Sequence, residues 1–228
     1  MKIKALITGA SGMVGHGILL ECLDSPEVES VLVVNRRSIG ITHKKLKEII
    51  VQDFFALSGI ENELSGYNAC FFSLGISSAG LGETEYNRIT YDLTMNFAKT
   101  VLQKNDDLTF CYVSGLGTDS SEKGRTMWAR VKGKTENALL KMPFKAAYMF
   151  RPGYIQPMKG VKSRTCIYQF MYNVFGFLFP IWNALFPNFV TTTERVGQAM
   201  LNVVRENPGS QILETRDINR IASKEIPS

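Results

Sequence analysis

A glycine-rich turn near the amino terminus constrains the fold more than any other feature of this sequence. The apolar run 3–8 leads directly into Gly9, Gly12 and Gly15, and a segment of helical period, 13–24, follows. Glycines at such positions permit a tight turn, let backbone N–H groups approach a pyrophosphate and let the helix pack closely on the strand. This order predicts a dinucleotide site, and an ordinary glycine-rich loop is the alternative. The predicted contacts are Gly9, Ser11, Gly12, Met13, Val14 and Gly15.

The rest of the chain alternates short β-branched runs with longer segments of helical period, which is typical of a parallel sheet. We predict an α/β fold of Rossmann type: a doubly wound, mostly parallel sheet with helices on both faces and a small C-terminal substrate cap. Thr191 and Glu194 have the spacing of a capping box, which predicts a helix through about Glu206. The predicted strands are 3–8, 30–35, 47–51, 69–73, 108–114, 146–151 and 211–214, and the other predicted helices are 13–24, 84–104 and 126–140.

Length and charge limit the classes of protein to consider. The chain has 228 residues, 45% of them hydrophobic, which suits one sizeable core and is short for two ordinary domains. We therefore expect a single domain over 1–228. The net charge of +5 is scattered, without a long basic run, so we expect no nucleic acid partner.

The cysteines and the first residues bear on metal binding and location. The four cysteines lie far apart without a C-x-x-C pair, which favours buried thiols over a metal site. The apolar run at the start ends at once in glycines and is too short for a signal peptide. We therefore expect no metal and a cytoplasmic location.

Segment 166–189 is unusually rich in aromatic residues. It has the length of a membrane span, but Pro180 and Pro187 interrupt it, and proline is costly inside a helix. We interpret 154–190 as an aromatic-rich insertion that caps a substrate pocket. A surface that contacts a partner or a membrane is the less favoured alternative.

The run Thr8-Gly9-Ala10-Ser11-Gly12-x-x-Gly15 resembles the nucleotide-binding signature of the atypical and extended short-chain dehydrogenase/reductases. The resemblance is strongest to the epimerase-like branch that includes NmrA-like and Tat-interacting reductase-like proteins. It implies an NAD(P)-binding fold and an oxidoreductase or epimerase-like activity. It also implies further cofactor contacts, at Asp53 and Phe54 beside the adenine, at Ser73, Leu74 and Gly75 beside the ribose, and at Arg151, Pro152 and Gly153.

The residues after the second predicted strand bear on the choice of cofactor. NAD-specific proteins of this fold usually carry a carboxylate there, whereas this chain has Asn35, Arg36 and Arg37. Guanidinium groups pair well with a 2′-phosphate, so the sequence favours NADP over NAD. Two solvated arginines on a loop are the alternative.

The resemblance also implies catalytic positions. Ser114 matches the serine that hydrogen-bonds the substrate, and Lys132 matches the lysine of the Tyr-x-x-x-Lys helix, which also binds the cofactor ribose. Trp128 stands in the place of the tyrosine, and an indole cannot exchange a proton as a phenol does. Tyr154 is a candidate substitute donor. We expect an NADP-dependent enzyme acting on a small apolar carbonyl or alcohol, with a dinucleotide-binding regulator or interaction protein that does not turn over as the alternative.

Overall fold

The computed structural model describes residues 2–161 and 188–223. The predicted aromatic segment 166–189 lies outside the described residues except for its last two, so its role as a substrate cap stays a prediction. Within the described part, Cys22, Cys70 and Cys111 are buried free thiols, as expected. Cys166 lies outside it.

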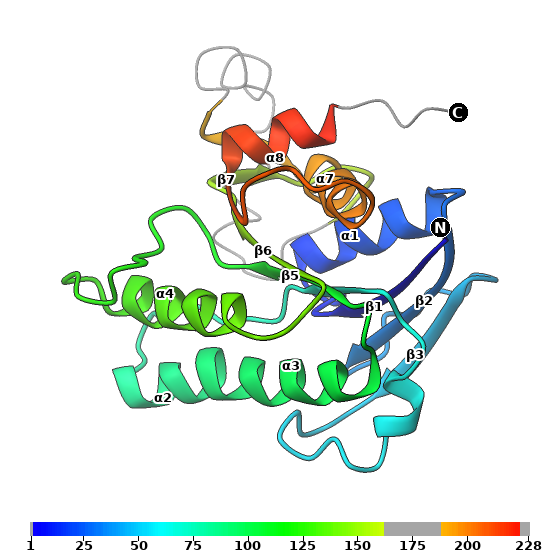
Figure 1. The fold of residues 1–228 in the computed structure, drawn as a ribbon, viewed down its shortest axis with the longest axis horizontal. Coiled ribbons are helices and arrows are strands. Elements are labelled where there is room, and N and C mark those ends of the chain that lie inside the picture. Colours follow the sequence, from blue (N-terminus) through cyan, green and yellow to red (C-terminus); the bar gives the residue numbers. More distant parts are fainter. Residues whose placement is uncertain (1, 162–187, 224–228) are drawn as a thin grey trace.

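A seven-stranded sheet, in which every pairing is parallel, forms the centre of the molecule (Figure 1). The strand order is β3-β2-β1-β4-β5-β6-β9, and the order reverses direction between β1 and β4. All seven predicted strands are present, with ends that differ by at most two residues from those expected. The strands are β1 (Ile3–Thr8), β2 (Val28–Asn35), β3 (Leu46–Ile50), β4 (Ala69–Phe72), β5 (Thr109–Val113), β6 (Ala146–Arg151) and β9 (Ile212–Glu214).

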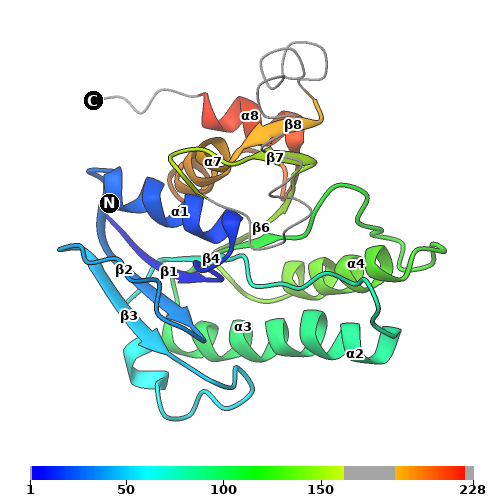
Figure 2. The same ribbon diagram turned by 180° about the vertical axis from the view of Figure 1, so that it is seen from behind.

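Helices cover both faces of this sheet (Figures 1 and 2). Buried side chains form one apolar cluster on each face, because successive side chains of a strand point to opposite sides. The doubly wound Rossmann-type fold is therefore confirmed. One face carries α1 (Met13–Asp24), α7 (Thr193–Arg205) and α8 (Thr215–Ala222), and the other carries α2 (Glu83–Asn87), η2 (Arg88–Asp92), α3 (Leu93–Lys104) and α4 (Met127–Leu140), with a short 3-10 turn, η1 (Glu61–Leu64), before β4.

The predicted helix 84–104 is interrupted by a wider turn. Residues 88–92, which form η2, adopt a π-helical conformation between α2 and α3. Such turns displace the side chains beside them and are frequent at functional sites. Here the turn carries Thr90, a buried residue that faces the candidate site described below.

The capping prediction for α7 is wrong by one residue. Thr192, not Thr191, caps the helix, and its hydroxyl accepts a hydrogen bond from the Arg195 N–H at 3.0 Å. Thr191 is held in strand β8 (Val190–Thr192), which pairs with β7 (Tyr154–Gln156) in a small parallel sheet. This pairing joins residues far apart in sequence, so no local pattern indicated it.

Two further observations bear on the classes of site. No helix in the described ranges is long and apolar enough to cross a bilayer. Across the same ranges, no group of three or more His, Cys, Asp or Glu side chains lies together as a metal site would require.

Candidate functional site

The glycine turn between β1 and α1 has a geometry that excludes larger residues. Gly9 has a φ of +75°, which favours glycine, and its carbonyl accepts a hydrogen bond from the Gly12 N–H at 2.8 Å. A Cβ atom at Gly9 would lie 2.7 Å from the carbonyl oxygen of Ser73. A Cβ atom at Gly15 would collide with the Gly9 carbonyl. The turn is therefore pressed against the segment that follows β4.

The N-terminus of α1 opens beside this turn. Gly12 is the N-cap and contributes no side chain, and the first turn of the helix holds no acidic residue. The unpaired N–H groups of a helix start and the helix dipole together favour an anion. The turn also lies where the strand order reverses, between β1 and β4, which is where open α/β sheets bind their ligands.

A first cleft, of about 530 Å³, extends from this turn to the end of β2, and we call it the arginine cleft. Asn35 is 2% exposed, and its side-chain NH₂ has no hydrogen-bond partner within the described part of the chain. A buried donor of this kind normally has a partner, so the cleft offers an unused donor beside two exposed guanidinium groups. This donor set suits an anionic ligand such as a phosphorylated ribose. The lining is Ser11, Asn35, Arg36, Arg37, Gln52 and Leu74.

A second cleft, of about 240 Å³, lies on the other side of Leu74, and we call it the lysine cleft. The segment that follows β4 and the end of β5 supply most of its walls, and η2 contributes Thr90. Leu74 lines both clefts, so the two are neighbouring compartments along one edge of the sheet. The lining is Val14, Ser73, Leu74, Gly75, Ile76, Ser77, Tyr86, Thr90, Tyr112, Val113, Ser114 and Lys132.

Ser114 and Lys132, both predicted as catalytic positions, come together in the lysine cleft. The Lys132 ammonium donates a hydrogen bond to the Ser114 carbonyl. The Ser114 hydroxyl donates to the carboxylate of Glu136 at 2.5 Å, one helical turn beyond the lysine. Because its proton is directed to Glu136, the hydroxyl presents mainly its lone pairs to other groups.

Glu136 is the centre of a buried charge cluster. Its side chain is fully buried and forms an ion pair with Arg151, whose Nε lies 3.1 Å from one carboxylate oxygen. Arg151 also contacts Glu214 at 3.3 Å and Ser120 at 2.5 Å. The pKa of Arg151 is raised above the ordinary arginine value, and its hydrogen bond to Glu136 is the largest cause. The cluster fixes the ends of β5 and β6 to α4.

The titratable groups of the lysine cleft have shifted pKa values. Burial lowers the pKa of Lys132 to about 8, although the nearby Glu136 charge opposes the shift. Burial raises the pKa of Tyr86 and of Tyr112 above the ordinary phenol value. The lysine is therefore the strongest acid among the three, and both phenols are weaker acids than usual.

Trp128 and Tyr154 are not among the described lining residues of this cleft. A Cβ atom at Gly117 would lie 3.5 Å from the Trp128 ring, so the indole packs over the loop that follows β5. The Tyr154 hydroxyl, in β7, donates to the Gln156 side chain at 2.9 Å.

The remaining predicted cofactor contacts divide into two groups. Asp53 is exposed, and its carboxylate accepts the Phe55 N–H at 2.8 Å, while Phe54 packs in the core against Phe97 at 5.9 Å between ring centres. The Arg151 guanidinium is engaged in the charge cluster. The Pro152 carbonyl accepts the Leu116 N–H, and Gly153 donates to the Thr215 hydroxyl, in the loops beyond β6. By contrast, Ser11, Val14, Ser73, Leu74 and Gly75 line the two clefts.

Several residues of the site were not anticipated from the sequence. Glu136 follows Lys132 by four residues, which places both on one side of a helix, and that spacing was an available signal. No such signal marked Tyr86, Thr90 and Tyr112, because an aromatic residue or a threonine in a helix or strand most often belongs to the core.

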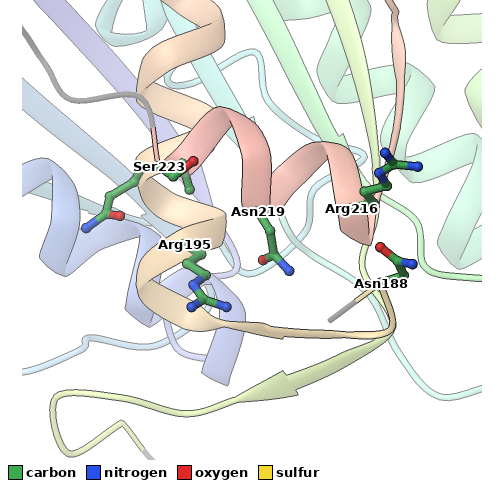
Figure 3. A pocket seen from close by; sticks show the side chains of 7 residues that line it. Asn188, Arg195, Arg216, Asn219 and Ser223 are labelled. Atoms are coloured by element: carbon green, nitrogen blue, oxygen red, sulfur yellow. The ribbon is translucent and has the colours of Figure 1, made fainter. Parts of the chain in front are cut away.

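A separate polar hollow of about 350 Å³ lies between α7 and α8. Figure 3 shows Arg195 and Arg216 on opposite sides of it with their guanidinium groups pointing in different directions, and Asn219 between them. None of its described lining residues is shared with the two clefts. Its remaining lining residues are Asn188, Gln198, Ala222 and Ser223.

Comparison with known sequences identifies distant relatives. No family model matches the chain. "Protein FMP52, mitochondrial" of Debaryomyces hansenii is 28% identical over 153 residues, which is 66% of this chain and 66% of that protein. The protein of the same name from Saccharomyces cerevisiae is 24% identical over 166 residues, 72% of this chain and 69% of that protein. The match thus spans about two thirds of the length of these relatives.

These names correct one expectation. The relatives are called mitochondrial, which contradicts the cytoplasmic location expected from the sequence. That expectation depended on separated cysteines and the lack of a signal peptide pattern at the start. Neither feature distinguishes the cytoplasm from the interior of an organelle.

Comparison with solved structures identifies the fold. ADP-L-glycero-D-manno-heptose-6-epimerase of Helicobacter pylori aligns with a TM-score of 0.66 and 16% identity, over 90% of this chain and 73% of that one. The carbonyl reductase Sniffer of D. melanogaster aligns with a TM-score of 0.64 and 13% identity, over 95% and 98%. The chain therefore has the Rossmann-type fold of these epimerase and short-chain dehydrogenase structures, as the glycine signature implied.

Proposed function

We propose that this chain binds NADP(H) and reduces the carbonyl group of a small apolar substrate, or oxidises the corresponding alcohol. The observation that carries this proposal is the pair of clefts that meet at Leu74, one cationic and one holding Ser114 and Lys132. Together they extend along the carboxyl edge of the sheet from the end of β2 to the end of β5, a path that suits a dinucleotide.

Each part of the cofactor has a matching part of the site. The N-terminus of α1 suits the pyrophosphate, and the arginine cleft, with the unpaired Asn35 donor, suits a 2′-phosphate. Lys132 and Ser114 would hold the nicotinamide ribose and the substrate in the lysine cleft. A reduced nicotinamide supplies a hydride when bound there. The names of the epimerase and the carbonyl reductase with the same fold agree with this class of chemistry.

The preference for NADP is tested by replacing both arginines of the cleft, R36A together with R37A. We expect NADPH affinity, measured by fluorescence titration, to fall about tenfold or more, because hydrogen bonds to a charged phosphate are lost. NADH affinity should change little, since NADH lacks the 2′-phosphate. K44A, which removes an exposed cation outside the described lining of both clefts, is the matched control. Equal losses for the two cofactors would exclude the 2′-phosphate assignment.

A second candidate function is dinucleotide binding without turnover, and Trp128 is the observation that favours it. The indole occupies the usual tyrosine position and packs over Gly117, outside the described lining of the lysine cleft. We would measure NADPH oxidation with a panel of apolar aldehydes and ketones for the natural chain and for W128Y. Turnover by the natural chain supports the reductase. Turnover by the variant alone supports the binding function.

A further inference from the structure

The lysine cleft lacks the tyrosine that usually exchanges the substrate proton, yet a carbonyl reduction still needs a proton donor. The described lining holds exchangeable protons on the hydroxyls of Ser73, Ser77, Thr90 and Ser114, on the phenols of Tyr86 and Tyr112, and on the ammonium of Lys132. Aliphatic hydroxyls are the weakest acids of these groups, and the Ser73 hydroxyl already donates to the Thr8 carbonyl. The Ser114 hydroxyl directs its proton to Glu136 at 2.5 Å, so this proton points away from a ligand. Ser114 is therefore suited to accept a hydrogen bond rather than to donate one.

The two phenols are poorly suited to proton transfer. Tyr86 and Tyr112 are 1% and 2% exposed and belong to the packed layer beneath the cleft. Tyr86 is hydrogen-bonded to Thr90 and Tyr112 to Thr135, and burial makes each phenol a weaker acid than usual. Either phenol would have to leave these contacts to reach a ligand.

Lys132 has the opposite properties. It is partly exposed, lines the cleft and is anchored through one hydrogen bond to the Ser114 carbonyl, which leaves two N–H donors of the ammonium. Ser114 is held in place in turn, because its hydroxyl is hydrogen-bonded to Glu136, which is hydrogen-bonded to Arg151. Burial lowers the pKa of Lys132 to about 8. A general acid is most effective when its pKa lies near the working pH, so this value suits proton donation near neutral pH.

We propose that Lys132 is itself the proton donor of the reduction, in place of the tyrosine that position 128 lacks. This inference rests on the proposed reductase function. An N–H bond of Lys132 breaks and an O–H bond forms on the carbonyl oxygen, while the carbonyl carbon receives two electrons as a hydride from the reduced nicotinamide. The carbonyl is reduced, the nicotinamide is oxidised, and the neutral lysine regains its proton from water. Ser114 and Glu136 are positioning residues in this scheme.

The decisive variant is K132R. Arginine keeps the positive charge and the hydrogen-bond donors but does not release its proton near neutral pH. We expect K132R to bind NADPH almost as the natural chain does, in a fluorescence titration, and to lose about 100-fold or more in single-turnover NADPH oxidation with 9,10-phenanthrenequinone. K134R is the matched control, because Lys134 lies on the same helix but contacts Asn87 at 3.1 Å and the Tyr91 ring.

Two further readouts complete the test. The rate of NADPH oxidation by the natural chain should fall as the pH rises through about 8, because Lys132 must be protonated to donate. Acetylation of Lys132 by acetic anhydride, followed by mass spectrometry on the cofactor-free protein, should rise through the same pH, rather than near the ordinary lysine value of about 10.4.

The outcomes separate this inference from the proposed function. Three outcomes would exclude Lys132 as the donor without excluding the reductase function. They are turnover that survives in K132R, turnover that is abolished in Y86F instead, and turnover by a natural chain whose Lys132 is acetylated only near the ordinary lysine pKa. A natural chain that binds NADPH but never oxidises it with any carbonyl would overturn both.

Discussion

At the scale of single residues, Glu136 is the most informative side chain in the molecule. It is fully buried and accepts hydrogen bonds from Ser114 and Arg151. A buried charge is tolerated only when it is paired, and removing one partner leaves the other uncompensated. The residue at position 136 therefore decides whether the ends of β5 and β6 remain fixed to α4, and whether Ser114 and Lys132 keep their positions.

We expect E136L to lower the free energy of unfolding by about 3–5 kcal/mol, because the Arg151 guanidinium would remain buried without its main partner. Urea unfolding followed by circular dichroism measures this difference. E83Q is the control, since Glu83 pairs with Arg130 at 2.7 Å but is 55% exposed, and such surface pairs contribute about 1 kcal/mol or less. A similar loss of unfolding free energy in the two variants would show that Glu136 contributes no more to stability than an exposed ion pair.

Lys132 gives the stability of the protein a dependence on pH. Its pKa in the folded state is about 8, below the ordinary lysine value, so between these two values the unfolded chain binds more protons than the folded one. Stability then rises with pH across that window, and the contribution is constant below it, where lysine is protonated in both states. We expect the natural chain to gain stability relative to K132M between pH 8 and about 10.4, measured by urea unfolding at each pH. A stability difference that stays flat would contradict the shifted pKa.

At the scale of helices and strands, close packing between α1 and α7 depends on two glycines. A Cβ atom at Gly17 would lie 2.5 Å from the Cβ atom of Thr193, and one at Gly197 would lie 2.6 Å from Cγ of Glu21. The Cβ atom of Thr193 cannot move aside without its backbone, and the same holds for the Cβ atom of Glu21, which would lie 2.9 Å from the atom added at Gly197. Both positions therefore leave too little room for a side chain.

We expect G17A to destabilise the protein by about 1–3 kcal/mol through overpacking, even though alanine is the better helix former. G197A should destabilise the protein by a similar amount, because its added Cβ atom would lie 2.9 Å from the Cβ atom of Glu21. G59A adds the same methyl group where no atom lies within 4 Å, and it should leave the midpoint of thermal unfolding almost unchanged. Equal midpoints for G17A and G59A would show that α1 and α7 adjust freely to the added volume.

Most strands and their order of occurrence were predictable because they are compact runs of apolar residues flanked by turn residues. The exception is β3, which contains Lys47 and Glu48 and no buried residue, and its apolar end indicated a strand. The pairing of β7 with β8 and the helix α8 were not predictable, since the first joins distant residues and the second is short, with a capping box from Glu214 and Asp217 at its start. The glycine turn followed from spacing, and the Ser114–Lys132 pair followed from the resemblance to the short-chain dehydrogenase/reductases. The charge cluster did not, because Arg151 and Glu136 meet only after β6 and α4 pack together.

At the scale of the whole molecule, the site depends on the point where the sheet reverses its strand order. The turn 9–15 follows β1, and Ser73 follows the adjacent β4; the Ser73 hydroxyl donates to the Thr8 carbonyl at 2.8 Å. The chain leaves β1 for helix α1 on one face, whereas α3, which follows β4, lies on the other. The crevice between these two exits is shared by both halves of the sheet, so a ligand bound there contacts both.

A cofactor in that crevice should therefore stabilise the entire fold. A ligand that binds only the folded state at about 100 times its Kd raises the free energy of unfolding by about 2.7 kcal/mol. We expect this gain for NADPH with the natural chain and with G59A, but not with G15A, because a Cβ atom at Gly15 would meet the Gly9 carbonyl and the Ser73 hydroxyl and displace the turn. Thermal unfolding with and without NADPH measures the gain in each variant. If G15A gained as much as G59A, NADPH would have to bind away from the glycine turn, and the assignment of both clefts to one dinucleotide would fail.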